Sequence, residues 1–197
     1  MSDDVPPDAQ AEIALAVRNA LAQHGYERLT TAKIAAELDM SESGLYYYYE
    51  SKDEMIAAFL DHAAGQLGEM LADTGSDDHE ANLRAACDHL FLSPEDPDAG
   101  VHVAIMELLS HAPYNETLRE PLLELEWATL NVLEDIVREG VEDGVFREVD
   151  PEATAAFLLA AADGSTGFHV ALGMEVGDSL DAGTDAYVDM LLSSDAD

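Results

Sequence analysis

The chain has 197 residues, and its 42 acidic against 8 basic residues give a formal net charge of −34 at pH 7. A hydrophobic content of 48% argues against disorder, and no apolar run approaches the roughly 18 residues of a transmembrane helix. Cys87 stands alone, which excludes an intrachain disulfide, and the acidic N-terminus lacks a signal-peptide core. We therefore expect a cytoplasmic protein with no membrane partner.

The first predicted helix runs from about Asp8 to Gly25. Pro6-Pro7 ends any earlier helix, Asp8 is placed to cap the new one, and Gly25 is expected to close it in a left-handed conformation. Its apolar residues recur at helical spacing: Ile13, Ala16, Val17, Ala20 and Leu21. We interpret this helix as support for the segment that follows.

Residues 30–49 are predicted to form two short helices joined by a tight turn at Asp39-Met40. The first begins near Thr31 and ends near Leu38, and Ser41 is placed to cap the second, Glu42 to about Tyr49. The buried set would be Ile34, Leu38, Met40 and Leu45. This spacing is that of a helix-turn-helix, although so short a pair also fits an ordinary core.

Features next to this pair favour contact with DNA. Ser51-x-x-Glu54 has the form of a capping box that starts a third helix. Lys52 lies in its first turn, where the helix dipole disfavours a cation, so a phosphate outside the helix is the better partner. The tyrosine run 46–49 cannot face one core with all four rings, so some hydroxyls must point outward.

The rest of the chain is predicted to be helical. A long helix from about Lys52 to Leu71 is followed by a linker at Thr74–Asp78. Further helices end near Leu92 and span about 101–112, 115–143, 151–172 and 180–192, with Pro- or Gly-containing turns between them. No strand pattern competes, so we expect an all-α protein of about nine helices.

Residues from about Glu12 to Leu60 resemble the DNA-binding domain of the TetR/AcrR family of one-component regulators. The matching pieces are His24-Gly25-Tyr26, Thr30-Thr31, Ile34-Ala35-Ala36-Glu37, Met40-Ser41-Glu42-Ser43-Gly44-Leu45-Tyr46 and Tyr47-Tyr48-Tyr49-x-Ser51-Lys52-Asp53-Glu54. The stretch Ala160–Leu172, with Asp163-Gly164 in the middle, also looks like the C-terminal domains of several TetR subgroups. The resemblance implies an N-terminal three-helix helix-turn-helix domain, 1–54, and a C-terminal helical effector-binding and dimerisation domain, 55–197, that share the 52–71 helix.

The resemblance also implies roles for single residues. Thr31, Tyr48 and Lys52 match positions that hold phosphates. Glu42, Ser43, Gly44 and Tyr47 match those nearest the base edges, with Ser41 and Tyr46 on the border between the two roles. Tyr49 stands where phenylalanine is usual and is expected in the core. Arg18 and Arg28 either reach the DNA backbone or are solvated surface charges.

Glu42 departs from the lysine or glycine that the family often has at this position. A carboxylate does not hold a phosphate, but it accepts a hydrogen bond from cytosine N4. An acid at the start of a helix is also favoured by the helix dipole alone. The sequence leaves both interpretations open.

The acidic charge is the main objection to DNA binding. Residues 1–60 carry 11 acidic and 4 basic residues, a net charge of −7, and residues 61–197 carry the remaining −27. This composition favours a salt-in halophile, because at about 1 M salt the Debye length is only about 3 Å; an ordinary acidic protein is the alternative. In high salt, DNA binding has to rely on neutral donors, shape and base contacts.

The C-terminal part is expected to form a homodimer. The 151–172 helix is apolar almost all round, and a partner subunit is its simplest cover. Together with the 180–192 helix it would make a four-helix interface about a two-fold axis. A dimer also lets two helix-turn-helix units bind two half-sites of an operator.

An unidentified small-molecule effector is expected in the same part of the chain. The candidate lining residues are His102, Met106, Leu109, Trp127, Phe157 and Phe168, although such a stripe is more often plain core. Trp127 is the best candidate, because a buried indole needs a partner for its N–H. The few arginines favour a neutral, apolar or cationic effector.

No catalytic residue, cofactor or metal ion is expected. Glu107 and His111 stand at i, i+4 spacing and are interpreted as a surface pair, and no nucleophile motif or Gly-rich phosphate loop is present. Our hypothesis is a ligand-responsive repressor, not an enzyme, that binds a palindromic double-stranded DNA operator as a dimer. The alternative is a helical dimeric small-molecule-binding or protein-interaction module without specific DNA binding.

Overall fold

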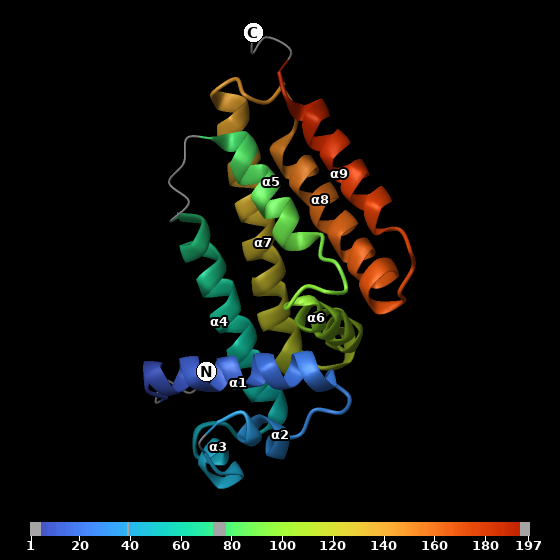
Figure 1. Cartoon of the computed structure of the whole chain (residues 1–197). Coiled ribbons are helices and arrows are strands. Elements are labelled where there is room, and N and C mark those ends of the chain that lie inside the picture. The colour runs from blue at the N-terminus through green and yellow to red at the C-terminus, as the bar shows by residue number, and fades with distance from the viewer. Residues whose placement is uncertain (1–4, 39, 73–77, 194–197) are drawn as a thin grey trace. The chain divides into compact units, whose positions relative to one another are not determined.

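The computed structural model describes residues 5–38, 40–72 and 78–193, without the side chains of residues 68–72. The described residues form nine α-helices and no strand, and the antiparallel bridge between Phe146 and Leu192 is isolated. The helices are α1 (Pro7–His24), α2 (Thr31–Ala36), α3 (Glu42–Tyr48), α4 (Lys52–Ala72), α5 (His79–Leu90), α6 (Ala99–His111), α7 (Glu116–Glu142), α8 (Pro151–Ser165) and α9 (Gly177–Leu191), with a 3-10 turn, η1 (Ala112–Tyr114), and a π-helical turn, η2 (Thr166–Ala171) (Figure 1). The all-α prediction is confirmed.

Some helix boundaries differ from those predicted. Asp8 does not cap α1, because Pro6 is the N-cap and Pro7 occupies the first helical position, where a missing N–H costs nothing. The predicted 151–172 helix divides into α8 and η2, and the hydrophobic pattern of the sequence does not distinguish the π-helical turn from the α-helix before it. Asp39 of the predicted turn and residues 74–77 of the predicted linker lie outside the described residues.

The chain divides into two compact units. Unit 1 comprises Met1–Gln66 and Pro97–Glu126, and unit 2 comprises Leu67–Asp96 and Trp127–Asp197. Both α4 and α7 pass from one unit into the other. The predicted division between residues 54 and 55, which the family resemblance implies, stays a prediction.

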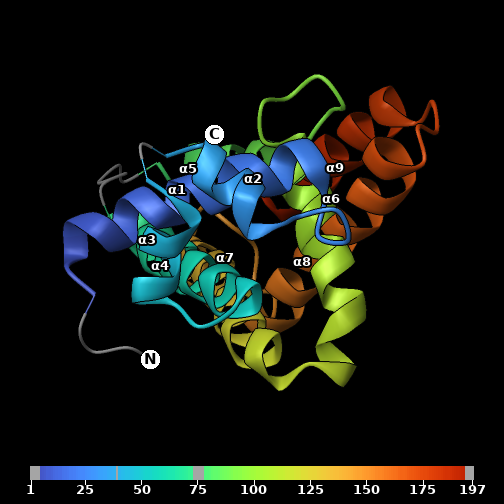
Figure 2. The same cartoon turned by 90° about the horizontal axis from the view of Figure 1, so that it is seen from below.

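Unit 1 places α2 and α3 next to α1. Helix α1 packs against α6 and α2, and α2 packs against α3 (Figures 1 and 2). One core joins these helices to the first turns of α4, and its fully buried members include Ile13, Val17, Leu21, Ile34, Leu45, Met55, Ile56 and Leu60. Burying each of these side chains stabilises the unit by about 1.5–3 kcal/mol, so the pair α2–α3 has a fixed base.

The turn between α1 and α2 is held by Glu107 of α6. Its Oε2 accepts a hydrogen bond from the Tyr26 amide at 2.8 Å, and its Oε1 accepts one from the Glu27 amide at 3.1 Å. Gly25 has a φ of 67°, and a Cβ on it would come within 2.8 Å of Glu107 Oε2. Glycine therefore fits here for two reasons, and Glu107 sets the path of the chain into α2.

Tyr26 ties the same turn to α4 and to the segment before α7. Its hydroxyl donates to Asp53 Oδ1 at 3.2 Å, and Asn115 Nδ2 donates to Asp53 Oδ2 at 2.8 Å. Burial, and then the Asp53 carboxylate, raise the pKa of the Tyr26 hydroxyl, so it stays a neutral donor. Lys52 Nζ donates to the Tyr26 carbonyl at 3.1 Å and lies 4.1 Å from the centre of its ring.

Unit 2 sets α5 beside α8 and α9 (Figure 1). Its core contains Leu83, Cys87, Leu133, Val137, Phe146, Leu158, Val188 and Leu191. Arg84 on α5 pairs with Asp185, at 3.1 Å, and with Asp189, both on α9. Asp150 caps α8 by accepting from the Ala153 amide at 3.2 Å.

Replacing Glu107 with Gln should lower the free energy of unfolding by about 1–3 kcal/mol, because the amide keeps one acceptor and turns its NH₂ toward a backbone N–H. Glu120→Gln, which alters an exposed carboxylate on α7, is the matched control and should change little. Chemical unfolding at equal KCl and protein concentration measures both. Equal values for the two variants would contradict the role given to Glu107.

Cys87 should be unreactive in the folded protein. Its side chain is 4% exposed, and burial raises the pKa of its thiol from 9.0 to about 11. Because a higher pKa leaves less thiolate, an aromatic disulfide reagent at about pH 8 should react at least about 100-fold more slowly with the folded protein than with the denatured chain. The rate of the folded protein should rise with pH, and comparable rates in both states would show that Cys87 is not buried.

Candidate nucleic-acid interface

Two capped helices form the candidate interface. At the start of α2, Thr30 Oγ1 accepts from the Lys33 amide, and at the start of α3, Ser41 Oγ accepts from the Gly44 amide, both at 3.3 Å. The predicted Ser41 cap is therefore confirmed. Behind the caps, two fully buried side chains join the helices to the core of unit 1: Ile34 and Leu45.

Packing also favours glycine at position 44. A Cβ on Gly44 would lie 2.6 Å from Met40 Cγ and 3.1 Å from Met40 Sδ. A larger residue would therefore push Met40 out of the position where it packs against the core. The predicted position of Gly44 near a base edge stays a prediction. Because glycine has no side chain, its backbone alone would make such a contact.

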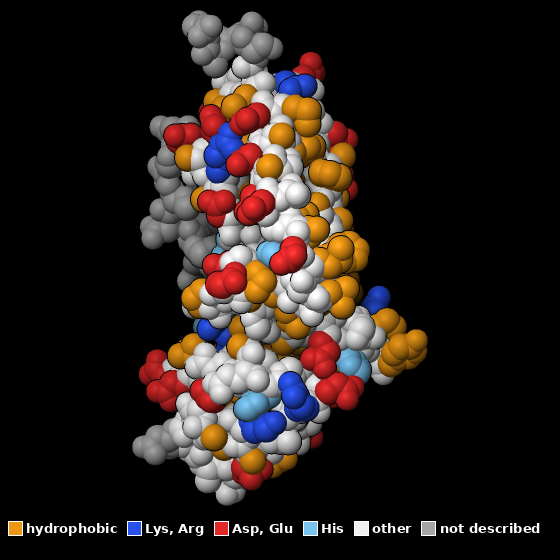
Figure 3. Space-filling model, turned by 45° about the vertical axis from the view of Figure 1, so that its right-hand side comes forward, with side chains coloured by type: hydrophobic (Ala, Val, Ile, Leu, Met, Phe, Trp, Pro, Cys, Tyr) orange, Lys and Arg blue, Asp and Glu red, His pale blue; other side chains and the backbone are white. Residues whose placement is uncertain are grey.

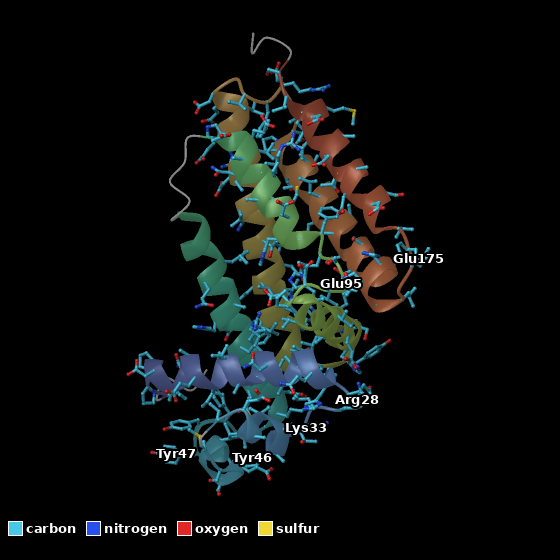
Figure 4. All side chains as sticks on the ribbon, in the orientation of Figure 1. Arg28, Lys33, Tyr46, Tyr47, Glu95 and Glu175 are labelled. Atoms are coloured by element: carbon cyan, nitrogen blue, oxygen red, sulfur yellow. The ribbon has the colours of Figure 1, made fainter. Side chains whose placement is uncertain are left out.

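The structure brings most of the predicted DNA-contacting residues to one surface. Tyr47 is 83% exposed and Tyr46 is 52% exposed on α3 (Figure 4). Ser41, Glu42 and Ser43 are exposed as well. The other four predicted DNA-contacting residues are partly buried: Thr31, Gly44, Tyr48 and Lys52. Tyr49 is 7% exposed and belongs to the core, as predicted.

Hydroxyl groups dominate this surface. Ser41 Oγ and Ser43 Oγ lie 3.2 Å apart, and the rings of Tyr47 and Tyr48 meet edge to face with centroids 5.1 Å apart. Thr31 Oγ1 donates to Glu42 Oε2 at 2.8 Å. A hydroxyl both donates and accepts without carrying charge, which suits phosphate oxygens and base edges alike.

The nearby cations are held by backbone carbonyls. Arg28 Nε donates to the His24 carbonyl at 3.1 Å, and Lys33 Nζ donates to the Arg28 carbonyl at 2.6 Å. Figure 4 shows both residues at the same end of unit 1 as the exposed tyrosines. Arg18 instead pairs with Asp98 within unit 1. No described carboxylate pairs with Arg28, Lys33 or Lys52, so their charges stay available to an anionic partner.

Sequence reasoning missed the residues that hold the interface in place. Glu107 and His111, predicted as a surface pair, instead contact the α1–α2 turn. The His111 ring lies 4.7 Å from the Tyr26 ring, and its Nε2 is 3.6 Å from Glu27. These contacts join residues about 80 positions apart, and no local pattern in a single sequence identifies them.

The predicted effector-lining residues fall into two groups. His102, Met106 and Leu109 lie on α6 in unit 1 and are partly buried. The other three belong to unit 2 and are exposed: Trp127 by 57%, Phe157 by 55% and Phe168 by 58%. The expectation that the Trp127 indole is buried is therefore wrong for this chain, because its position on α7 faces outward. The pocket itself stays a prediction.

Two further features concern the described residues alone. No three of their His, Cys, Asp and Glu side chains come together in a group able to hold a metal ion. None of their helices combines the length and the apolar character that crossing a membrane requires.

Comparisons with known proteins agree with this geometry. Residues 13–59 match the family described as "Bacterial regulatory proteins, tetR family", and residues 79–193 match "BetI-type transcriptional repressor, C-terminal". A TetR transcription regulator from Haloarcula marismortui is 32% identical, with a TM-score of 0.78 over 94% of this chain and 99% of that one.

Two more distant proteins are also similar. A regulator from Saccharomonospora viridis, whose crystal structure contains choline, is 18% identical, with a TM-score of 0.79 over 95% of this chain and 98% of that one. The fatty acid metabolism regulator protein of Bacillus subtilis is 26% identical over 132 residues, which is 65% of this chain and 66% of that protein's length.

The C-terminal match covers more than half of the chain, and the Haloarcula regulator aligns over nearly all of it. The helix-turn-helix of unit 1 lies inside the N-terminal match. The chain therefore belongs to the TetR family of transcriptional regulators, with a C-terminal domain of the BetI type.

Proposed function

We propose that this protein is a cytoplasmic, ligand-responsive repressor that binds a palindromic DNA operator as a homodimer. The observation that carries the proposal is the exposed hydroxyl-rich surface of α3 and the start of α2, held on a rigid core. In each subunit α3 would enter the major groove. Ser43, Gly44 and Tyr47 would then lie nearest the base edges, and Thr31, Tyr48 and Lys52 would contact phosphates.

Neutral donors are the feature that reconciles DNA binding with the acidic charge. Among the residues that the structure describes, Arg28, Lys33 and Lys52 are the Lys and Arg side chains near this surface, so counterion release contributes little to affinity. Hydroxyl contacts depend less on salt than ion pairs do. This composition supports a salt-rich cytoplasm, in which a binding surface of this kind works.

The dimer interface is proposed on α8, η2 and α9. Hydrophobic side chains gather on the surface of unit 2 over these elements (Figure 3). The exposed members are Phe157, Phe168, Leu172, Met174 and Met190. A monomer rarely exposes so many large apolar side chains together, and a two-fold partner would cover them with its own copy of the surface.

An effector would act by shifting the population between DNA-competent and DNA-incompetent states. The α1–α2 turn is bonded to α6 through Glu107 and to α4 through Asp53, so a movement of either helix changes the position of α2. Arg84 and Arg138 already pair with carboxylates, which leaves few cations for an anionic effector. A neutral or cationic small molecule is therefore the better candidate, and choline in the Saccharomonospora protein is a cation bound by the same fold.

Tyr47→Ala should weaken binding to a selected duplex by about 10-fold or more, because the substitution removes the exposed side chain that is proposed to contact a base. The duplex is selected from a randomised pool by the unchanged protein, and affinity is measured by fluorescence anisotropy at fixed KCl. Tyr114→Ala, which removes a 91%-exposed tyrosine from η1, is the matched control and should bind normally. Normal binding by both variants would show that Tyr47 does not contact the bases. Failure of the unchanged protein to select any duplex would favour a helical module without specific DNA binding.

Leu172→Asp should convert the dimer to a monomer, because a charge within the apolar surface cannot be buried against its own copy. Leu15→Asp makes the same change at a 56%-exposed leucine of α1 and should leave the dimer intact. Light scattering after gel filtration reports the mass of each variant. A dimer in both cases would place the interface elsewhere.

A further inference from the structure

Glu42 lies where a carboxylate opposes DNA binding. It is exposed at the start of α3, and its Oε2 accepts the hydrogen bond of the Thr31 hydroxyl at 2.8 Å. The Tyr46 hydroxyl lies 3.4 Å from the same Thr31 oxygen. Thr31 begins α2 and Glu42 begins α3, so this bond links the first residues of the two helices of the motif.

The charge of Glu42 is not neutralised within unit 1. The three cations nearest in sequence donate to the carbonyls of the α1–α2 turn: Arg28, Lys33 and Lys52. No ion pair joins a described basic side chain to Glu42. A full negative charge therefore stands on the surface that faces the DNA, where it repels phosphate.

The same bond occupies a donor that DNA would use. Thr31 is expected to hold a phosphate, and its hydroxyl has one proton to donate. As long as the Thr31 hydroxyl donates its hydrogen bond to Glu42, a phosphate at Thr31 meets a carboxylate instead of a donor. The bond between Thr31 and Glu42 thus closes the phosphate position in the free protein.

We propose that Glu42 determines specificity by weakening binding to DNA sequences that offer it no base amine, an inference that rests on the proposed DNA-binding function. On the operator, Glu42 turns to an exocyclic amine of a base, such as cytosine N4, and the Thr31 hydroxyl is released to a phosphate. One hydrogen bond is lost and two are made. On other sequences no base amine is offered, so the carboxylate keeps the Thr31 proton and repels the backbone.

The test compares Glu42→Ala with Glu50→Ala, which removes another exposed carboxylate just beyond α3. Affinity is measured for the selected duplex and for a scrambled duplex of the same composition, at one KCl concentration. Glu42→Ala should strengthen binding to the scrambled duplex by about 3- to 10-fold and lower the selectivity ratio by about 10-fold. Glu50→Ala should strengthen both complexes by the same small factor.

A double-mutant cycle isolates the Thr31 bond. In a Thr31→Val background no hydroxyl is released and only the repulsion of phosphate is relieved, so the gain from Glu42→Ala on the scrambled duplex should be smaller than in the unchanged background. Circular dichroism of each variant checks that the helices remain folded.

The outcomes separate the two proposals. If the unchanged protein selects a duplex but Glu42→Ala behaves as Glu50→Ala does, the specificity role of Glu42 is overturned and DNA binding stands. An undiminished gain in the Thr31→Val background likewise overturns it. If the unchanged protein shows no selectivity, the proposed function fails and this inference fails with it.

Discussion

The structure of unit 1 depends on how the α1–α2 turn satisfies its backbone groups. A turn between two helices leaves amides and carbonyls without helical partners, and burying them unpaired is costly. Glu107 accepts from the amides of Tyr26 and Glu27. Lys52, Lys33 and Arg28 donate to three carbonyls of the same turn, those of Tyr26, Arg28 and His24. Side chains of α6, α4, α2 and the turn itself thus bind five backbone groups of four residues, and the position of α2 follows from these bonds.

This arrangement uses positive charge for structure in a chain that has little of it. Arg18, Arg84 and Arg138 pair with carboxylates, and the three cations near the helix-turn-helix, Arg28, Lys33 and Lys52, bind carbonyls. The surface left for DNA is made of tyrosine, serine and threonine hydroxyls. Such a surface contributes little long-range attraction, so selectivity must come from contacts made at close range. A carboxylate at Glu42 is consistent with that requirement, because it penalises contacts with the wrong sequence.

Local chemistry was predictable from the sequence wherever a residue acts on its own neighbours. Ser41 caps α3 as expected, and Ser51 accepts from the Glu54 amide at the start of α4. The other half of the predicted capping box differs, because the Glu54 carboxylate takes the Glu50 amide instead of that of Ser51. Leu45 and Tyr49 are buried while Tyr46 and Tyr47 are exposed, which follows from helical spacing against one core.

Contacts between distant parts of the chain were not predictable. Nothing near Glu107 in the sequence shows that its carboxylate binds backbone amides about 80 residues earlier. The π-helical turn at η2 and the exposed position of Trp127 depend on how unit 2 packs, and helical periodicity does not contain that information. Asp8 failed as a cap because two prolines before it already set the start of α1.

The most direct test of the account is the salt dependence of sequence-specific DNA binding, measured from low to molar KCl with a duplex selected by the protein itself. With three available cations in each subunit of a dimer, the slope of log K against log [KCl] should be shallower than about −5, and selectivity should persist at about 1 M KCl. A steeper slope with selectivity lost in high salt would contradict a surface that works through neutral donors. Absence of selectivity at every KCl concentration would show that the helix-turn-helix serves only as scaffold.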